Sequence, residues 1–303
     1  MTAVAVGLVV GLGWVTLLLF APREEPTQGG RLEVIAGLYP LAFIADQVGG
    51  EHVAVTTLAE PGIEPHDLEL SPVDVRSLRE ARLVLFISEF QPALDDAIDS
   101  TDAHGLDAAS LVVLRPPASS SNPEAEGAQL DPHFWLDPTL FAEYALGVAE
   151  EFAALDPPNA DDYRANARAL AEDLDALDRE FASGLASCER DTIIVSHEAF
   201  GYLADRYSLT QIGISGLDPE AEPSPARLRE VRALAEQAGA TTIYFEALLD
   251  PSVVQAFAED AGLAVASLDP IESIFASPLG DEATYFDQMG LMLEVLREGL
   301  GCA

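Results

Sequence analysis

Three of the chain's five histidines lie at the boundaries of predicted strands or helices. His66 lies in "GIEPHDLE", beyond the apolar run "VAVTTLA"; His133 lies in "DPHFWLDP", where a helix is expected to begin near Pro138; and His197 directly follows "TIIVS". In open α/β sheets, ligands collect beyond the carboxyl ends of the strands. Imidazoles bind transition-metal ions, so these three histidines are candidate metal ligands.

Two carboxylates share this kind of position. Glu246 ends the run "TTIYFE", and Asp269 follows the run "LAVASL". Zinc combines imidazole nitrogens at about 2.0–2.1 Å with a carboxylate oxygen in a tetrahedral shell. The pattern therefore predicts a metal centre that suits zinc. His52 and His104 lie in turn-like segments, and we expect them to be ordinary surface residues.

Short apolar runs alternate with helical patterns in both halves of the sequence. The expected strands are "LEVIAGLY", "VAVTTLA", "LVLFIS" and "LVVL" in the first half, and "TIIVS", "QIGIS", "TTIYFE" and "LAVASL" in the second. Ser224 and Pro225 are typical of a helix start, and Gly239 of a helix end. Regular alternation of strands and helices predicts an α/β fold with two parallel-sheet lobes.

One long helix is expected to join the two lobes. Its apolar positions recur at helical spacing and define one buried face: Tyr163, Leu170, Leu174, Leu177, Phe181 and Leu185. A stiff connector of this kind limits how far the lobes can swing. The resulting divisions are an N-terminal segment (1–22), a linker (23–30), an N-terminal lobe (31–157), the linking helix (158–187) and a C-terminal lobe (188–303).

The composition favours an exported protein with no nucleic-acid partner. Asp and Glu number 52 against 15 basic residues, all of them arginine, which gives a formal net charge of −37. Such a surface repels polyanions. Residues 2–21 are uncharged and long enough, at about 1.5 Å per residue, to span a bilayer as a helix. We expect them to be an uncleaved anchor or an atypical signal segment.

The two cysteines, Cys188 and Cys302, are expected to form one disulfide in an oxidising compartment. Such a bond would tie the C-terminal tail to the beginning of the second half of the chain. Chain-entropy arguments give it a stabilising effect of about 4 kcal/mol or less.

Several motifs together resemble one known family. "GIEPHDLELSP", "DPHFWLDP", "VSHEAFGYLADRY", "LDPEAEPSPARL" and "LDPIES" occur in the order seen in the zinc and manganese receptors of ABC transporters, and the resemblance covers nearly all of residues 31–303. It implies a monomeric solute-binding protein with two α/β lobes joined by one long helix and the metal held in the cleft between them. Such a protein is not an enzyme and delivers its metal to a membrane permease. Carried over by motif, the ligands are His66 and His133 from the first lobe, and His197 and Asp269 from the second.

The third ligand bears on the choice of metal. Manganese receptors that resemble this sequence carry glutamate at the position of His197, and imidazole favours zinc over manganese. The resemblance thus favours Zn²⁺, with Mn²⁺ as the alternative. Pro65 stands where some members have a glutamate that reaches the metal. This leaves Asp269 as the better fourth ligand, and Glu64 and Glu246 are expected to lie behind the ligands or to orient an imidazole N–H.

Two further functions compete with a receptor. Three histidines and a water could form an exported zinc hydrolase with Glu198 or Glu246 as base, but no H-E-x-x-H helix occurs and Asp269 would fill the open position. The second competing function is adhesion at the cell surface, because relatives of this family have been described as adhesins, but no motif in this sequence supports it. The segment 115–131 has no histidine, unlike the metal-collecting loops of many zinc receptors, and is expected to be a surface loop.

Overall fold

The computed structural model describes residues 30–59, 62, 64–117, 130–246, 250–273 and 283–303. The chain divides into Met1–Gly30 and one compact unit, Arg31–Ala303. The expected anchor at 2–21 and most of the loop at 115–131 lie outside the described residues. Within the described ranges, no helix is both long and apolar enough to cross a membrane.

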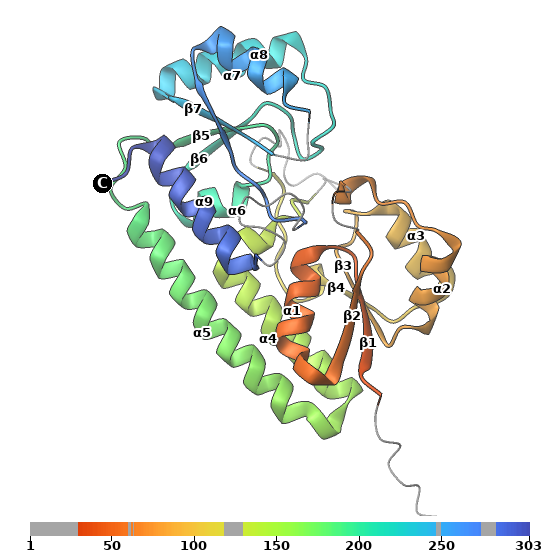
Figure 1. Ribbon diagram of the computed structural model, residues 1–303. Coiled ribbons are helices and arrows are strands. Elements are labelled where there is room, and N and C mark those ends of the chain that lie inside the picture. The colour runs from red at the N-terminus through yellow and green to blue at the C-terminus, as the bar shows by residue number, and fades with distance from the viewer. Residues whose placement is uncertain (1–29, 60–61, 63, 118–129, 247–249, 274–282) are drawn as a thin grey trace, which may run out of the picture. The chain divides into compact units, whose positions relative to one another are not determined.

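Arg31–Ala303 contains two four-stranded parallel sheets (Figure 1). The first has the order β2-β1-β3-β4, and its strands are β1 (Leu32–Ala36), β2 (Val53–Thr57), β3 (Leu83–Phe86) and β4 (Gly105–Asp107). The second has the order β6-β5-β7-β8, with β5 (Thr192–Val195), β6 (Thr210–Gly213), β7 (Thr242–Phe245) and β8 (Ala264–Ser267). The predicted α/β class with two parallel sheets is confirmed.

The fourth strand of the first sheet is not where the apolar pattern placed it. The run Leu111–Leu114 was predicted as a strand, but the structure pairs Gly105–Asp107 with β3 instead. Asp107 ends β4 and its side chain accepts hydrogen bonds from the N–H groups of Ser88 and Ala109, so a 3₁₀ turn follows at once. That turn takes the apolar run away from the sheet, and Val113 is 84% exposed.

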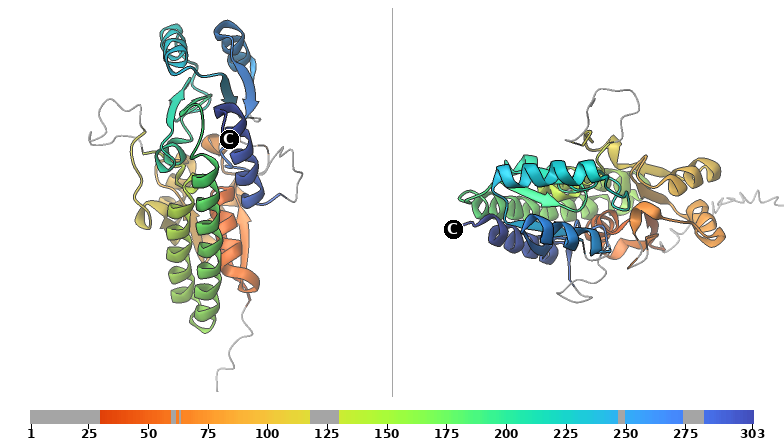
Figure 2. Two further views of the ribbon diagram at one scale, coloured as in Figure 1. Left: turned by 90° about the vertical axis from the view of Figure 1, so that its left-hand side faces the viewer. Right: turned by 90° about the horizontal axis from the view of Figure 1, so that it is seen from above.

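Helices cover both faces of each sheet (Figures 1 and 2). They are α1 (Tyr39–Gly49), α2 (Pro72–Glu80), α3 (Pro92–Thr101), α4 (Pro138–Leu155), α5 (Ala160–Gly184), α6 (Gly201–Arg206), α7 (Pro225–Ala238), α8 (Ser252–Ala261) and α9 (Tyr285–Leu300). Against the second sheet, α7 and α8 pack on one side, and α6 and α9 also contact its strands. The helix ends follow local chemistry: the Ser224 hydroxyl caps α7 by accepting from Arg227 N–H, and Gly239 ends it with φ +64°.

The long helix that the periodicity predicted is α5, with 25 residues. Its buried face matches the expected one: Tyr163, Ala167, Leu170, Leu174, Leu177 and Phe181. A short 3₁₀ turn joins it to α4, and the two helices run side by side (Figures 1 and 2). α5 also contacts α1 beside the first sheet and α9 beside the second, so it is bound to both halves of the chain.

One apolar core extends through the whole unit. It runs from Val34 of the first sheet through Phe152 and Leu174 on α4 and α5 to Val195 and Tyr244 of the second. Two smaller clusters fill the spaces under α2 and α3 and under α7 and α8. Near the C-terminus, Cys188 and Cys302 form the predicted disulfide. The predicted lobe boundaries at 157 and 188 stay a prediction.

Candidate metal centre

The structure brings together the three histidines that the sequence singled out. His66 lies in the 3₁₀ turn Pro65–Asp67 that follows β2, His133 immediately precedes the 3₁₀ turn Phe134–Leu136, and His197 is the second residue after β5. Because the strands of each sheet are parallel, the loops that leave their carboxyl ends emerge on the same side. The imidazole centroids of the three residues lie 5.4–5.9 Å apart.

A fourth side chain, that of Glu272, lies among the three rings. Its Oε1 atom is 3.0 Å from Nε2 of His133, 3.6 Å from Nε2 of His66 and 3.8 Å from Nε2 of His197. One candidate ligand atom from each of these four residues lies within 4.8 Å of the other three. We call these four residues the His₃Glu group. In tetrahedral zinc sites, ligand distances of about 2.0–2.1 Å separate neighbouring ligand atoms by about 3.3 Å.

Two nitrogens of the His₃Glu group are buried and have no hydrogen-bond partner among the described residues. They are Nε2 of His66 and Nε2 of His197. His197 is completely buried, and the His66 side chain is 13% exposed. An imidazole nitrogen that is shielded from water and makes no hydrogen bond loses its solvation without compensation. Coordination of a cation by both lone pairs would remove this cost, so the donor set fits a metal ion.

Two carboxylates fix the ring orientations from behind. The Nδ1 atom of His133 hydrogen-bonds Asp131 Oδ1 at 2.7 Å, and the backbone N–H of His133 donates to the same oxygen at 3.0 Å. The Nδ1 atom of His197 contacts Glu246 Oε1, which also accepts a hydrogen bond from the Ser196 hydroxyl. With each Nδ1 engaged in this way, the Nε2 atoms face the centre of the group.

The pKa values of the group reflect burial and mutual hydrogen bonding. Burial favours neutral imidazole at His133, but hydrogen bonds to Asp131 and Glu272 outweigh it and raise the His133 pKa to about 10. Burial likewise opposes ionisation of Glu272, yet its hydrogen bond with His133 and the nearby imidazole of His66 hold its pKa well below the usual range. The two residues thus form a buried ion pair between Nε2–H of His133 and the Glu272 carboxylate.

The structure does not bring Asp269 into the His₃Glu group. Its Oδ1 accepts a hydrogen bond from the backbone N–H of Ile271 at 2.7 Å, which shapes the turn after β8. Burial raises the pKa of Asp269 to about 7, and the nearby charges of Glu246 and Glu272 act in the same direction. Glu272, three residues further along the chain, lies among the histidines where Asp269 was expected. A ligand role for Asp269 stays a prediction.

The other sequence candidates lie beside the group or at the surface. Glu246 holds the Nδ1 side of His197, as expected. Glu64 accepts from the backbone N–H of His66, and burial together with the charge of Glu272 raises its pKa to about 9. His52 and His104 pair with surface carboxylates away from the group.

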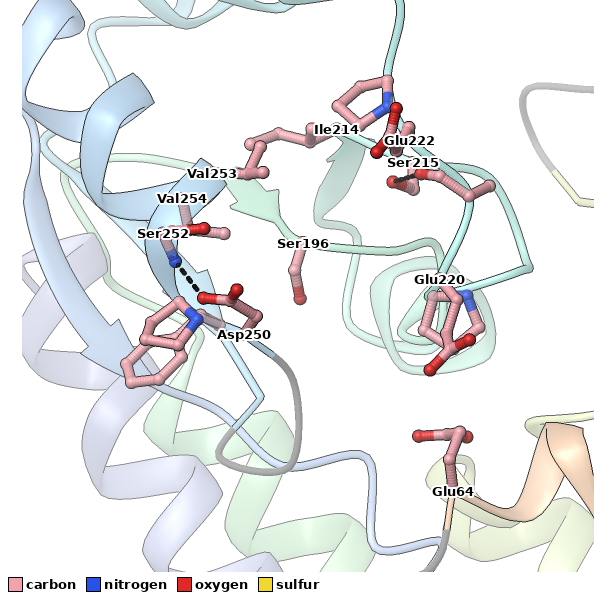
Figure 3. Close-up of a pocket in the computed structure, with 15 residues that line it drawn as sticks. Glu64, Ser196, Ile214, Ser215, Glu220, Glu222, Asp250, Ser252, Val253 and Val254 are labelled. Carbon is pink, nitrogen blue, oxygen red and sulfur yellow. Dashed lines mark hydrogen bonds between the residues drawn. The ribbon is translucent and has the colours of Figure 1, made fainter.

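A pocket of about 410 Å³ is lined by Glu64 and Ser196, which lie two residues before His66 and one residue before His197. Figure 3 shows Glu64 below it, Glu220 facing Glu64, and Ser196 at its back. Glu64 comes from the first half of the chain, whereas the other lining residues all come from the second. Four carboxylates line the pocket: Glu64, Glu220, Glu222 and Asp250. Glu64 is neutral near pH 7 because its pKa is about 9, so the charge of the remaining acidic groups makes this opening more favourable for a cation than for an anion.

The segment that carries Glu272 is fixed to the first half of the chain. The indole N–H of Trp135 donates to the carbonyl of Pro270 at 2.8 Å, and the Tyr39 N–H donates to the carbonyl of Glu272 at 3.3 Å. The hydroxyl of Tyr285 donates in turn to the Trp135 carbonyl at 2.7 Å. Trp135 therefore holds the turn that presents Glu272.

Sequence reasoning missed Glu272 and Asp131 as members of the site. Both lie in quoted motifs, "LDPIES" and "LDPHFWLDP", but each competes there with another acidic residue. Strand-end position favoured Asp269, which comes earlier after β8. The spacing Asp131-x-His133 was a usable signal, because a carboxylate two residues before a histidine can reach its Nδ1 across a tight turn.

Residues 34–299 match the family described as "Zinc-uptake complex component A periplasmic". This match covers most of the chain, which therefore belongs to that family. Its members are solute-binding receptors and not enzymes.

Individual relatives agree in sequence and in fold. The "Zinc-binding lipoprotein AdcA" of Streptococcus pneumoniae is 29% identical over 292 residues; the alignment covers 93% of this chain but only 58% of that protein. The zinc-bound ZnuA-like domain of AdcA from the same species superposes with a TM-score of 0.75 at 28% identity, covering 89% of this chain and 99% of the domain. The laminin-binding protein Lmb of Streptococcus agalactiae, titled bifunctional with adhesin and metal-transporting activity, gives a TM-score of 0.79 at 29% identity, covering 89% of this chain and all of that one.

Proposed function

We propose that this protein is an extracytoplasmic zinc receptor that captures Zn²⁺ and delivers it to the permease of an ABC transporter. The observation that carries the proposal is the convergence of three imidazole Nε2 atoms and one carboxylate oxygen. Two of these nitrogens are buried and have no hydrogen-bond partner in the part of the chain that the structure describes. Family membership and the zinc-binding relatives support the same function.

The ligands in this proposal are the four residues of the His₃Glu group. His66 and His133 come from the first half of the chain, and His197 and Glu272 from the second. A metal held by all four links both halves, so it stabilises the arrangement in which the halves are together. Zinc needs the imidazoles neutral, so capture must displace the proton that His133 holds against Glu272.

The donor set favours zinc over manganese. Three imidazoles and one carboxylate fill a tetrahedral shell, which is the geometry zinc prefers. Manganese prefers oxygen ligands and more of them. A second carboxylate, Asp269, is close enough to Glu272 for the charge of Glu272 to raise the Asp269 pKa. The Oδ1 atom of Asp269, however, accepts a hydrogen bond from the backbone N–H of Ile271.

A hydrolytic zinc site is the weaker alternative. Catalytic zinc sites keep a fourth position open for water. Here Glu272 Oε1 lies close to the Nε2 atoms of all three histidines, where that water would bind. The adhesive activity stated for the S. agalactiae protein is not carried over, because no described feature of this chain identifies a laminin-binding surface.

The first experiment is competition calorimetry of the zinc-stripped protein with Zn²⁺ and Mn²⁺. We expect one site with zinc affinity in the nanomolar range and much weaker manganese binding. His197→Ala and Glu272→Gln should each weaken zinc binding by at least about tenfold to a hundredfold. His104→Ala is the matched control, because His104 also pairs with a carboxylate, Glu151, at the surface.

The same titration separates the candidate carboxylates. If Glu272 is the fourth ligand, Asp269→Asn will weaken zinc binding less than Glu272→Gln. The reverse order would restore Asp269 as the ligand. Zinc binding that tolerates loss of His197 would refute the proposed site. Delivery to the permease is tested by growth under zinc limitation in cells that lack their own receptor. The wild type should restore this growth and His197→Ala should not. The protein is expected to act as a monomer.

A further inference from the structure

The carboxylate that orients His133 is itself held by the other half of the chain. Asp131 is 1% exposed, and its Oδ1 accepts from both the backbone N–H and Nδ1 of His133. Its backbone N–H donates to the carbonyl of Arg115 at 2.7 Å, which makes Arg115 and Asp131 an antiparallel bridge. This bridge belongs to the first half, and its outer side faces α6 of the second.

The hydroxyl of Tyr202 joins the bridge to α6. It donates to the backbone carbonyl of Asp131 at 2.9 Å and accepts from the backbone N–H of Arg115 at 3.0 Å. Tyr202 is 3% exposed, and burial raises its pKa above the ordinary value, so the hydroxyl remains a donor. The Arg115 guanidinium lies 4.3 Å from the centre of the Tyr202 ring and pairs with Asp205 on the same helix.

The backbone of α6 also approaches Asp131 closely. A Cβ atom added to Gly201 would lie 2.8 Å from Asp131 Oδ2, closer than real contacts allow. Glycine at 201 therefore permits a separation between α6 and the carboxylate that no other residue would. Asp131 is thus confined by Gly201 on one side and by the Tyr202 hydroxyl on another.

The position of α6 gives this contact its significance. Tyr202 follows His197 by five residues, so one short segment carries a candidate ligand and the contact to the opposite half. His197 presents Nε2 from one end of this segment, while Tyr202 reaches Asp131 and, through it, His133. A connected set of hydrogen bonds, Tyr202 to Asp131 and Asp131 to His133, therefore links the segment that carries His197 to the second imidazole.

We propose that Tyr202 is a positioning residue for metal capture: its hydroxyl fixes Asp131, and thereby His133, relative to His197. This inference rests on the proposed zinc site, since it concerns how two of its ligands are held. Without the hydroxyl, the Asp131 carbonyl loses its donor and the bridge is free to shift on α6. Nε2 of His133 then no longer has one fixed distance from Nε2 of His197.

A purely structural role for the hydroxyl would have different consequences. Loss of two buried hydrogen bonds lowers stability whether or not the metal site is affected. Tyr207 provides the matched comparison, because its hydroxyl donates to Asp178 at 3.2 Å and its ring stacks on Phe181, away from the His₃Glu group. Tyr202→Phe and Tyr207→Phe each remove one tyrosine hydroxyl. Only the Tyr202 hydroxyl is hydrogen-bonded to Asp131, which in turn binds His133.

The experiment compares zinc affinity, zinc release and the visible spectrum of the Co²⁺-substituted protein in the wild type and both variants. We expect Tyr202→Phe to weaken zinc affinity by about tenfold, mainly through faster release to a chelator, and to alter the Co²⁺ bands. Tyr207→Phe should leave affinity within twofold and the spectrum unchanged, although its melting temperature falls.

Two results would overturn the inference. One is zinc affinity and a Co²⁺ spectrum in Tyr202→Phe that equal those of the wild type; the other is an equal loss in Tyr207→Phe. The wild-type titration distinguishes this failure from failure of the proposed function. If wild-type zinc binding depends on His197 and Tyr202→Phe has no effect, the receptor stands and the positioning role falls. If the wild type binds no zinc at His197, both fall.

Discussion

Zinc binding near neutral pH should release a proton from His133. The perturbation is addition of Zn²⁺ to the stripped protein at pH 7.5. Hydrogen bonds to Asp131 and Glu272 raise the His133 pKa to about 10, so this imidazole carries a proton that zinc must displace from Nε2. Glu272 contributes no proton, because its pKa lies well below the usual range.

The size of the effect follows from the pKa of His133. A group that titrates at about 10 is protonated in all but about one molecule in 300 at pH 7.5, since each pH unit is a factor of ten. Proton competition should therefore weaken the apparent zinc affinity about 300-fold relative to the deprotonated protein. Affinity should rise about tenfold per pH unit from pH 7 to 9, because a raised pKa favours the form that zinc cannot bind.

Calorimetry in buffers of different ionisation enthalpy measures the released protons directly. We expect at least one proton per zinc in the wild type and fewer in Asp131→Asn, which lacks the charge that raises the His133 pKa. Asp162→Asn is the control: Asp162 makes a similar contact, 3.1 Å from His52 Nε2, at the surface. No proton release at pH 7.5, or zinc affinity that is constant between pH 7 and 9, would refute this account of His133.

Three further outcomes are expected. Glu246→Gln should weaken zinc binding by about tenfold to a hundredfold, because its carboxylate orients His197; an affinity within twofold of the wild type in chelator competition would contradict this. Replacing Cys188 and Cys302 by serine should lower the free energy of unfolding by about 2–4 kcal/mol in urea titrations and leave zinc affinity unchanged, and equal stability would show that the bond adds nothing. In the zinc-stripped protein, the raised pKa of His133 contributes stability that is fully present below about pH 6.5 and is lost as the pH rises through about 10. The melting temperature of the stripped protein should therefore fall across this pH range. A melting temperature that rises would count against the buried ion pair.

Much of the fold could be predicted because its signals are local. Fully buried parallel strands appear as continuous apolar runs, and the buried face of α5 repeats at helical spacing. β4 escaped prediction because it has only three residues, none of them fully buried, and gains its place by pairing with β3. The run Leu111–Leu114 had the stronger local pattern but no strand beside it.

The metal centre was predictable in its histidines and less so in its carboxylates. His66 and His197 follow strands, so the position of the strand predicts where each ring lies. Asp269 and Glu272 lie in one turn, where three residues of backbone decide which side chain faces the rings. That choice depends on contacts from the other half of the chain, such as Trp135 N–H to the Pro270 carbonyl, and no local pattern records them.

The continuous core described above also limits the entropy of metal capture. Two lobes on a flexible linker would lose a broad range of relative orientations when an ion joined them, and that loss would subtract from the affinity. Here α5 packs beside both sheets, and apolar contacts continue from Val34 to Val195 without a break. Few orientations remain to be lost, so most of the coordination free energy is expressed as tight binding. The same rigidity opposes release, so under the proposed function the work of opening the site would fall to the permease that receives the metal.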